Sequence, residues 1–181
     1  MALPKPPLAV DLDGTLIRGD LFGAAMWRLA TREPWRLPML AVWLLRGRAF
    51  AKFQLAALYP VVAATLPYDL RVVAWLRAER ATGREIALAT AFDRAGADAV
   101  AAHLNCFDRV FASDGRVNLK SHRKAEALAA AYPEGFVYAG NERADLAVWL
   151  AAKAAVVVNA SPALEREARL RFSIERVFAR E

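Results

Sequence analysis

The chain has 181 residues, which corresponds to one main domain with room for an insertion. Hydrophobic residues make up 57% and charged residues 24%, so the composition excludes a wholly disordered chain. The single cysteine, Cys106, excludes an internal disulfide framework and a cysteine-ligated zinc or iron–sulfur site, and it is typical of a reducing compartment.

The positive charge is concentrated in one segment. The net charge is +6, and residues 20–68 contribute most of it, because their only acidic residues are Asp20 and Glu33. Trp27, Trp35 and Trp43 lie in the same segment. Such a balance fits phosphorylated substrates, an anionic membrane surface or nucleic acid. No recognised nucleic-acid motif is present, so nucleic acid is not an expected partner.

The first half of the chain begins with a strand and continues with helices. Residues 8–10 form a short apolar run, which predicts a buried strand that ends at Asp11. Asp20 is a suitable N-cap for the helix that follows, and prolines delimit the later helices. These helices are expected over residues 21–32, 38–46 and 49–59.

From Pro67 onward, strands alternate with helices. Asp69 can cap the first of these helices and Gly83 ends it. This alternation predicts βαβ units, and we expect a three-layer α/β domain with a five-stranded parallel sheet. The expected helices cover residues 70–81, 93–104, 121–131, 142–152 and 162–181, and the strands cover residues 85–90, 109–113, 135–139 and 155–159.

Polar residues stand near the carboxyl ends of several predicted strands. Because these ends meet at one edge of a parallel sheet, we expect their side chains to converge on one crevice. The crevice would then hold carboxylates, one ammonium group and one hydroxyl. The residues concerned are Asp11, Asp13, Thr90, Lys124, Asn141 and Asp145.

Two carboxylates that lie two residues apart at a strand end can serve as nucleophile and as general acid/base in the cleavage of a phosphate ester. Side chains at positions i and i+2 face the same side of a strand. One carboxylate can attack phosphorus, and the other can protonate the leaving alcohol and later deprotonate water. The charge of the phosphate must be neutralised, which Mg²⁺, a lysine and a hydroxyl can do.

In their order along the chain, these residues resemble the four motifs of the haloacid dehalogenase (HAD) superfamily. The resemblance extends over essentially the whole chain. It implies a HAD-like core domain, residues 1–18 and 69–181, and a helical cap over residues 19–68. A carboxylate at the position of Asp13 implies phosphate-ester or phosphoanhydride chemistry, since the dehalogenase and phosphonatase members lack it. The motifs are Asp11, Asp13, Gly14 and Thr15; Thr90; Lys124; and Gly140, Asn141 and Asp145.

The resemblance also implies a Mg²⁺ site. Asp11 would be the nucleophile and a metal ligand, and Asp13 the general acid/base with its main-chain carbonyl on the metal. Asn141 and Asp145 would complete the site, directly or through water. The family usually has Asp at the position of Asn141. An amide oxygen can still bind Mg²⁺, but with one negative charge fewer, so we expect weaker metal binding.

The remaining implied roles concern the phosphoryl group. Thr90, with its neighbour Ala91, would bind the group that is transferred. Lys124 would hold both this group and the Asp11 carboxylate. Lys120 is the alternative active-site lysine and a candidate substrate ligand. Lys124 is favoured because it opens an amphipathic helix, with Leu128 four residues further on.

A narrower resemblance is to the soluble HAD-like domain that precedes UbiA-type membrane prenyltransferases. In that group the fourth motif also carries Gly-Asn. The resemblance implies a phosphorylated lipid-linked or isoprenoid-pathway substrate. It is carried by residues 46–48, 112–115, 118–120, 138–145 and 158–162.

We therefore expect a cytoplasmic, Mg²⁺-dependent phosphate monoester hydrolase that acts through an aspartyl-phosphate. Phosphotransfer to an acceptor other than water stays open. So does a weakly catalytic or non-catalytic module that docks on a membrane or a membrane prenyltransferase through the basic, Trp-rich segment. A membrane span is not expected, because Pro60 and Pro67 interrupt the longest uncharged run, which is shorter than the roughly 20 residues a bilayer requires.

Overall fold

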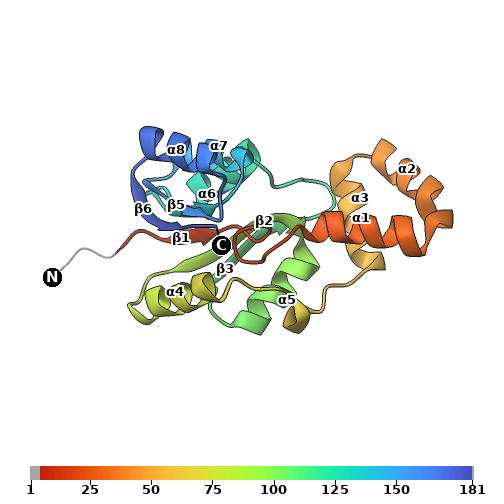
Figure 1. Ribbon diagram of the computed structural model, residues 1–181, viewed down its shortest axis with the longest axis horizontal. Helices are drawn as coiled ribbons and strands as arrows, with labels where there is room; N and C mark the ends of the chain where they lie inside the picture. Colours follow the sequence, from red (N-terminus) through yellow and green to blue (C-terminus); the bar gives the residue numbers. More distant parts are fainter. Residues whose placement is uncertain (1–4, 181) are drawn as a thin grey trace.

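Within residues 5–180, which this computed structural model describes, six parallel strands form a central sheet (Figure 1). The strand order is β3-β2-β1-β4-β5-β6, so the chain leaves β1 first in one direction and then in the other. Ligand sites in such sheets lie at the carboxyl ends of the strands where the order reverses, here β1 and β4. The strands are β1 (Leu8–Val10), β2 (Ile86–Asp93), β3 (Arg109–Ser113), β4 (Val137–Gly140), β5 (Ala154–Val158) and β6 (Ile174–Phe178).

Each face of the sheet is covered by its own layer of helices (Figure 1). Along β1, Leu8 and Val10 pack into one layer and Ala9 into the other, because side chains alternate along a strand. All three are completely buried, as is typical of a parallel sheet. The first layer contains α4 (Leu70–Ala81) and α5 (Arg94–Leu104), and the second contains α6 (His122–Ala131), α7 (Leu146–Ala151) and α8 (Pro162–Arg171).

Three further helices extend from one end of the sheet (Figure 1). They share an apolar cluster of their own around Leu29, Leu40 and Leu55. The predicted N-cap of the first is confirmed, since the Asp20 carboxylate accepts a 3.0 Å hydrogen bond from the N–H of Phe22. Nowhere in the described residues does a helix have the length and apolar character needed to cross a membrane. The helices are α1 (Leu21–Arg32), α2 (Leu37–Leu45) and α3 (Arg48–Leu58), with short 3₁₀ turns at η1 (Pro34–Arg36) and η2 (Ala63–Thr65).

Two contacts connect α3 to the sheet. The ammonium group of Lys52 donates a 3.1 Å hydrogen bond to the carbonyl oxygen of Ala91 in β2. The ring of Phe53 packs against Gly115, in the loop after β3, so closely that a Cβ there would lie 3.2 Å from the ring. Gly115 also has a φ of +83°, which favours glycine. The helical segment is therefore seated on β2 and on the loop after β3.

The sheet has one strand more than the sequence predicted. We expected the last helix to run to the end of the chain, but α8 ends at Arg171 and β6 pairs with β5 instead. The buried guanidinium of Arg84 holds Glu175 of β6 at 2.6 Å, and the ring of Phe178 contacts that of Trp75. These contacts add to the β-propensity of isoleucine, valine and phenylalanine and outweigh continuation of the helix.

The second strand is also longer than expected, which changes the position of Thr90. We predicted that this strand ends at Thr90, but β2 continues to Asp93. Asp93 pairs with Ser113 of β3, and its carboxylate accepts a 2.9 Å hydrogen bond from the N–H of Ala95 at the start of α5. Thr90 therefore lies inside the strand and not at its end.

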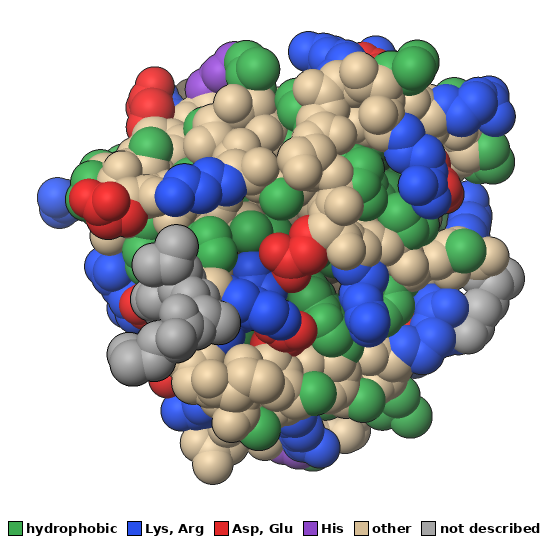
Figure 2. Space-filling view, turned by 90° about the vertical axis from the view of Figure 1, so that its left-hand side faces the viewer, with side chains coloured by type: hydrophobic (Ala, Val, Ile, Leu, Met, Phe, Trp, Pro, Cys, Tyr) green, Lys and Arg blue, Asp and Glu red, His purple; other side chains and the backbone are tan. Residues whose placement is uncertain are grey.

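The most basic segment of the chain lies at one end of the molecule (Figure 1). Figure 2 shows the end opposite α1, α2 and α3, where basic and acidic side chains are interspersed. The net positive segment, residues 20–68, contains α1, α2 and α3 and therefore lies at the other end (Figure 1). Most of the net positive charge is thus found at the end where the carboxyl ends of β1 and β2 meet the helical segment.

Candidate active site

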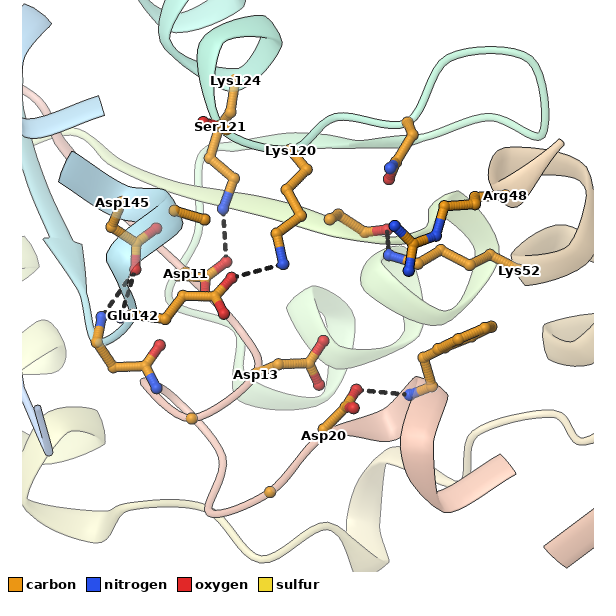
Figure 3. A pocket seen from close by; sticks show the side chains of 17 residues that line it. Asp11, Asp13, Asp20, Arg48, Lys52, Lys120, Ser121, Lys124, Glu142 and Asp145 are labelled. Atoms are coloured by element: carbon orange, nitrogen blue, oxygen red, sulfur yellow. Dashed lines mark hydrogen bonds and ion pairs between the residues drawn. The ribbon is translucent and has the colours of Figure 1, made fainter. Parts of the chain in front are cut away.

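A cavity of about 600 Å³ lies at the carboxyl ends of β1 and β4 (Figure 3). Its walls come from the turn after β1, the loops after β3 and β4, and helices α1 and α3. Five of the residues predicted to converge line it: Asp11, Asp13, Lys124, Asn141 and Asp145. The other charged residues of the lining are Asp20, Arg48, Lys52, Lys120 and Glu142.

The centre of the cavity is a buried ion pair. Lys124, in the first turn of α6, places its ammonium 2.7 Å from a carboxylate oxygen of Asp11, directly after β1. Both residues are less than a tenth exposed. Burial raises the pKa of the Asp11 carboxyl above its ordinary value, and the charge of Lys124 opposes that rise. A carboxylate held in this way is desolvated and oriented, as a nucleophile requires.

Tyr138 of β4 connects this pair to Asp145. The Lys124 ammonium donates a 2.7 Å hydrogen bond to the Tyr138 hydroxyl, which in turn donates to an Asp145 carboxylate oxygen at 2.9 Å. Burial raises the pKa of this phenol well above its ordinary value, so it stays a neutral donor. Tyr138 is not among the site residues predicted from the sequence. Its one signal is a hydroxyl in an otherwise apolar buried strand, where such a group needs a partner.

Asp145 also organises the turn after β4. Its second carboxylate oxygen accepts the backbone N–H groups of Asn141 and Glu142, each at 2.9 Å. The Asn141 side chain lies against Gly14, so closely that a Cβ on Gly14 would collide with the amide. The hydroxyl of Thr15 donates to the Asn141 amide oxygen at 3.3 Å. The turns after β1 and β4 are thereby joined.

Asp13 occupies the side of the cavity next to α1. Its carboxylate accepts a 2.9 Å hydrogen bond from the N–H of Leu21, the first residue of α1. Burial raises the pKa of Asp13 to about 6, although the N–H of Leu21 opposes this shift. A carboxyl group with a pKa in this range can both give and take a proton near neutral pH, which is the property a general acid/base needs.

Of the predicted substrate ligands, Thr90 does not line the cavity, and Lys120 lines it without contacting Asp11. Thr90 is completely buried and is not among the described residues that line the cavity; its hydroxyl oxygen accepts the N–H of Phe92 at 3.0 Å. Its neighbour Ala91 does line the cavity. Lys120 lines it as well but binds Glu142 at 2.9 Å, whereas Lys124 binds Asp11. Of the two lysines, the structure brings Lys124 to the carboxylate after β1.

The helical segment and one loop supply further cavity residues that were not predicted from the sequence. Arg48 and Lys52 of α3 reach the cavity, and so does Asn118 from the loop after β3. The net positive charge of residues 20–68 was the available signal, but it did not distinguish basic residues that face the cavity from those that face solvent.

The oxygen atoms of the site fit a hard divalent cation such as Mg²⁺ that has few protein ligands. In the described part of the chain, no three His, Cys, Asp or Glu side chains form a group that could hold a metal. Both carboxylate oxygens of Asp145 accept hydrogen bonds, whereas Asp11 binds Lys124 through one oxygen and the Asn141 amide oxygen accepts a hydrogen bond from Thr15. Asp11 and Asn141 each keep an oxygen lone pair that a metal could use, so both are side-chain candidates. Mg²⁺ commonly takes one or two carboxylates and completes its shell with water and substrate phosphate.

No protein-family model matches this chain, but a curated protein has substantial sequence identity to it. The uncharacterized protein y4nM of Sinorhizobium fredii is 39% identical over 165 residues. The match covers 91% of this chain and 32% of the relative, so the chain spans about a third of the length of that protein.

Solved structures resemble the whole of the described fold. A Bordetella pertussis protein of unknown function matches 97% of this chain and 99% of its own, with a TM-score of 0.71 and 18% identity. A phospho-aspartyl intermediate analogue of phosphoserine phosphatase matches 97% of this chain and 94% of its own, with a TM-score of 0.64 and 16% identity. The HAD family hydrolase t0658 of Salmonella enterica matches 96% and 68%, with a TM-score of 0.66 and 14% identity. The chain thus has the Rossmann-like α/β fold of HAD-family phosphatases and hydrolases.

Proposed function

We propose that this protein is a Mg²⁺-dependent phosphate monoester hydrolase that acts through an aspartyl-phosphate on Asp11. The observation that carries the proposal is the buried 2.7 Å ion pair of Asp11 with Lys124 at the carboxyl end of β1, with Asp13 two residues further on. A protein of the same fold, phosphoserine phosphatase, has been solved as an analogue of a phospho-aspartyl intermediate, which supports the same chemistry here.

The reaction has two steps that share one pair of carboxyl groups. In the first, an Asp11 oxygen attacks the substrate phosphorus, and the bond from phosphorus to the alcohol oxygen breaks as the bond to Asp11 forms. Asp13 gives its proton to the departing alcohol. In the second, Asp13 takes a proton from a water molecule, which attacks the same phosphorus and releases phosphate from Asp11.

The surrounding groups offset the charge of the phosphoryl group and orient the reacting carboxylate. Lys124 orients the Asp11 carboxylate and offsets the charge of the phosphoryl group. Ala91 and Lys120 are the candidates for further contact with that group, and the buried Thr90 precedes Ala91 in β2. Asn141 and the main-chain carbonyl of Asp13 would hold Mg²⁺ together with Asp11, and Asp145 would orient this site through its hydrogen bonds. Bound Mg²⁺ would supply additional neutralisation of the phosphate charge.

We assign residues 19–68 as a helical cap and residues 1–18 with 69–181 as the core domain. The separate apolar cluster of α1, α2 and α3 supports this division. So does their placement, because α1 and α3 contribute side chains to the cavity wall while the reacting carboxylates come from the core. A cap in this position would decide which alcohol portion of the substrate can enter.

The test is phosphate release from p-nitrophenyl phosphate with and without Mg²⁺. We expect Mg²⁺-dependent turnover in the wild type, and a loss of at least about 10³-fold in Asp11→Asn, because the nucleophile is removed. Asp98→Asn is the matched control: this exposed residue pairs with Arg94 on the surface of α5 and should leave turnover unchanged. Full turnover by Asp11→Asn would refute the mechanism.

A second candidate function is docking on a membrane surface or a membrane enzyme, with weak or no catalysis. Large apolar side chains on the cap are strongly exposed: Trp27 by 73%, Trp35 by 71% and Leu45 by 88%. The segment is basic, which suits anionic lipid. The resemblance to the domain that precedes UbiA-type prenyltransferases supports this candidate, and it also supports a phosphorylated lipid-linked or isoprenoid-pathway substrate.

Co-sedimentation with vesicles tests this second candidate. We expect binding to vesicles that contain an anionic lipid at low salt, weaker binding at high salt, and loss of binding in the double variant Trp27→Ala, Trp35→Ala. The control Leu170→Ala removes an 87% exposed side chain from α8, outside the cap, and should still bind. Absence of wild-type binding at both salt concentrations would exclude docking on lipid.

A further inference from the structure

Two basic side chains extend into the cavity from the side opposite the Asp11–Lys124 pair (Figure 3). Both come from α3: Arg48 is its first residue, and Lys52 follows one turn later. Among the described residues neither forms an ion pair, although Lys52 donates to the Ala91 carbonyl at 3.1 Å. This side of the cavity therefore holds two positive charges without a carboxylate in contact with them.

The surroundings of Lys52 are unfavourable for its charge. The side chain is partly buried, and burial lowers the pKa of its ammonium group. The negative charges of Asp13 and Asp20 raise this pKa, whereas the positive charges of Lys120 and Arg48 lower it further. Like charges that gather in a desolvated pocket are stabilised when an anion enters between them.

A neutral group in the loop between β3 and α6 also lacks a partner. The amide oxygen of Asn118 is the one buried side-chain polar atom of the described residues that makes no hydrogen bond. Asn118 lines the same cavity as Arg48 and Lys52. An unsatisfied buried acceptor is costly, so a ligand that brings a hydroxyl or N–H donor to it would be favoured.

We propose that Arg48 and Lys52 form a second anion-binding subsite, so that the substrate is a phosphate monoester that carries a further anionic group on the same molecule. This inference rests on the proposed function, which places the scissile phosphate at Asp11. The further group is a carboxylate or a second phosphate, since both accept hydrogen bonds from a guanidinium and an ammonium. A hydroxyl between the two groups would meet Asn118. Because the lining is mostly charged, an apolar tail would have to leave the cavity rather than fill it.

Two substrate pairs test the subsite, each differing in one anionic group. The first is 3-phosphoglycerate against glycerol 3-phosphate, and the second is fructose 1,6-bisphosphate against fructose 6-phosphate. We expect the wild type to prefer the doubly anionic member of at least one pair by about tenfold or more in kcat/KM. The pair that shows the preference distinguishes a carboxylate from a phosphate.

Variants of the two basic residues locate the preference. In Arg48→Gln and Lys52→Gln the preference should fall below about threefold, because kcat/KM falls much more for the doubly anionic member of a pair than for the singly anionic member. Arg77→Gln is the matched control. It removes the same charge from the exposed face of α4 and should keep the full preference. A wild type that hydrolyses both members of each pair equally well, or a preference that survives in both variants, overturns the subsite.

A binding measurement separates this inference from the proposed function. Calorimetric titration of Asp11→Asn protein with the same four compounds requires no turnover. If no phosphate monoester is hydrolysed by the wild type but the doubly anionic compounds still bind about tenfold more tightly, in a manner that requires Arg48, the subsite stands and the proposed activity fails. Equal binding of both members of each pair would overturn the subsite, whatever the activity.

Discussion

The hydroxyl of Tyr138 lies 2.7 Å from the ammonium of Lys124 and links the two ends of the candidate site. On one side Lys124 holds Asp11 at 2.7 Å, and on the other Tyr138 holds Asp145 at 2.9 Å. Asp145 in turn binds the backbone of the turn that carries Asn141. A neutral phenol therefore connects the turn after β4 to the lysine of the buried Asp11–Lys124 pair.

Removal of this hydroxyl should affect catalysis more than substrate binding. In Tyr138→Phe, Lys124 and Asp145 each lose a buried partner, which should lower the free energy of unfolding by about 1–3 kcal/mol. We expect kcat to fall by about tenfold or more with KM nearly unchanged, because Lys124 is less well oriented. Urea denaturation and steady-state kinetics measure the two effects.

Tyr132→Phe is the matched control for this prediction. The Tyr132 hydroxyl donates to Glu85 at 2.8 Å, and neither residue lines the cavity among the described residues. This variant should lose stability with kcat intact. If both variants gave the same kcat, the hydroxyl of Tyr138 would have a purely structural role.

Replacement of Gly14 should weaken metal binding beyond its effect on folding. Gly14→Ala places a side chain at a φ of +72° and drives it into the Asn141 amide. Gly83→Ala, at a φ of +86° with no atom near its Cβ, isolates the backbone cost of about 1 kcal/mol. We expect a larger loss of stability in Gly14→Ala, together with a higher Mg²⁺ concentration for half-maximal activity. Equal Mg²⁺ dependence in the two variants would contradict a metal role for Asn141.

A carboxylate in place of Asn141 should have the opposite effect on Mg²⁺. Asn141→Asp adds a negative charge close to Asp145, which already accepts the N–H of residue 141. Without metal the added repulsion should lower Tm. With Mg²⁺ the additional anionic ligand should lower the half-saturating concentration by about tenfold. Thermal denaturation and activity over a Mg²⁺ series check both directions, and a variant that needs more Mg²⁺ than the wild type would contradict the prediction.

Asp69 should make stability depend on acid pH. Hydrogen bonds from Arg71, and also from Asn159, hold the pKa of its buried carboxyl well below the ordinary value of 3.8. A carboxyl group whose pKa is lowered by folding contributes stability above its unfolded pKa and loses it as the pH falls toward the folded value. Asp69→Asn should therefore reduce Tm by a constant amount from pH 8 to pH 5, and by less below about pH 4. A difference that stays unchanged at pH 3 would contradict this account.

The local features of the fold were predictable because they depend on short stretches of sequence. Asp20 and Asp69 cap α1 and α4 as expected, since an aspartate before an amphipathic run satisfies free N–H groups wherever the helix packs. The order of strands and helices followed from apolar runs, and that order predicted one crevice at the carboxyl ends. The sixth strand was not predictable, because β6 depends on the distant partners Arg84 and Trp75.

The contents of the site were only partly predictable for a related reason. Asp11, Asp13 and Lys124 stand at strand and helix ends, and the topology alone brings them together. Whether Arg48 and Lys52 face the cavity depends on how α3 is seated on β2, which no local pattern reveals. Thr90 illustrates the converse: the sequence places it at the end of a strand, but β2 continues for three residues beyond it and its side chain is buried.

The packing of Phe53 on Gly115 makes one side chain a spacer between two walls of the cavity. One wall is α3, with its two basic residues, and the other is the loop that carries Lys120 and leads into α6. A smaller residue at position 53 would allow the walls to approach each other, and a bulkier one would hold them apart. The distance between these two walls is therefore adjustable at a position that is not among the described residues lining the cavity, so the shape of the cavity can change without a substitution of any lining residue.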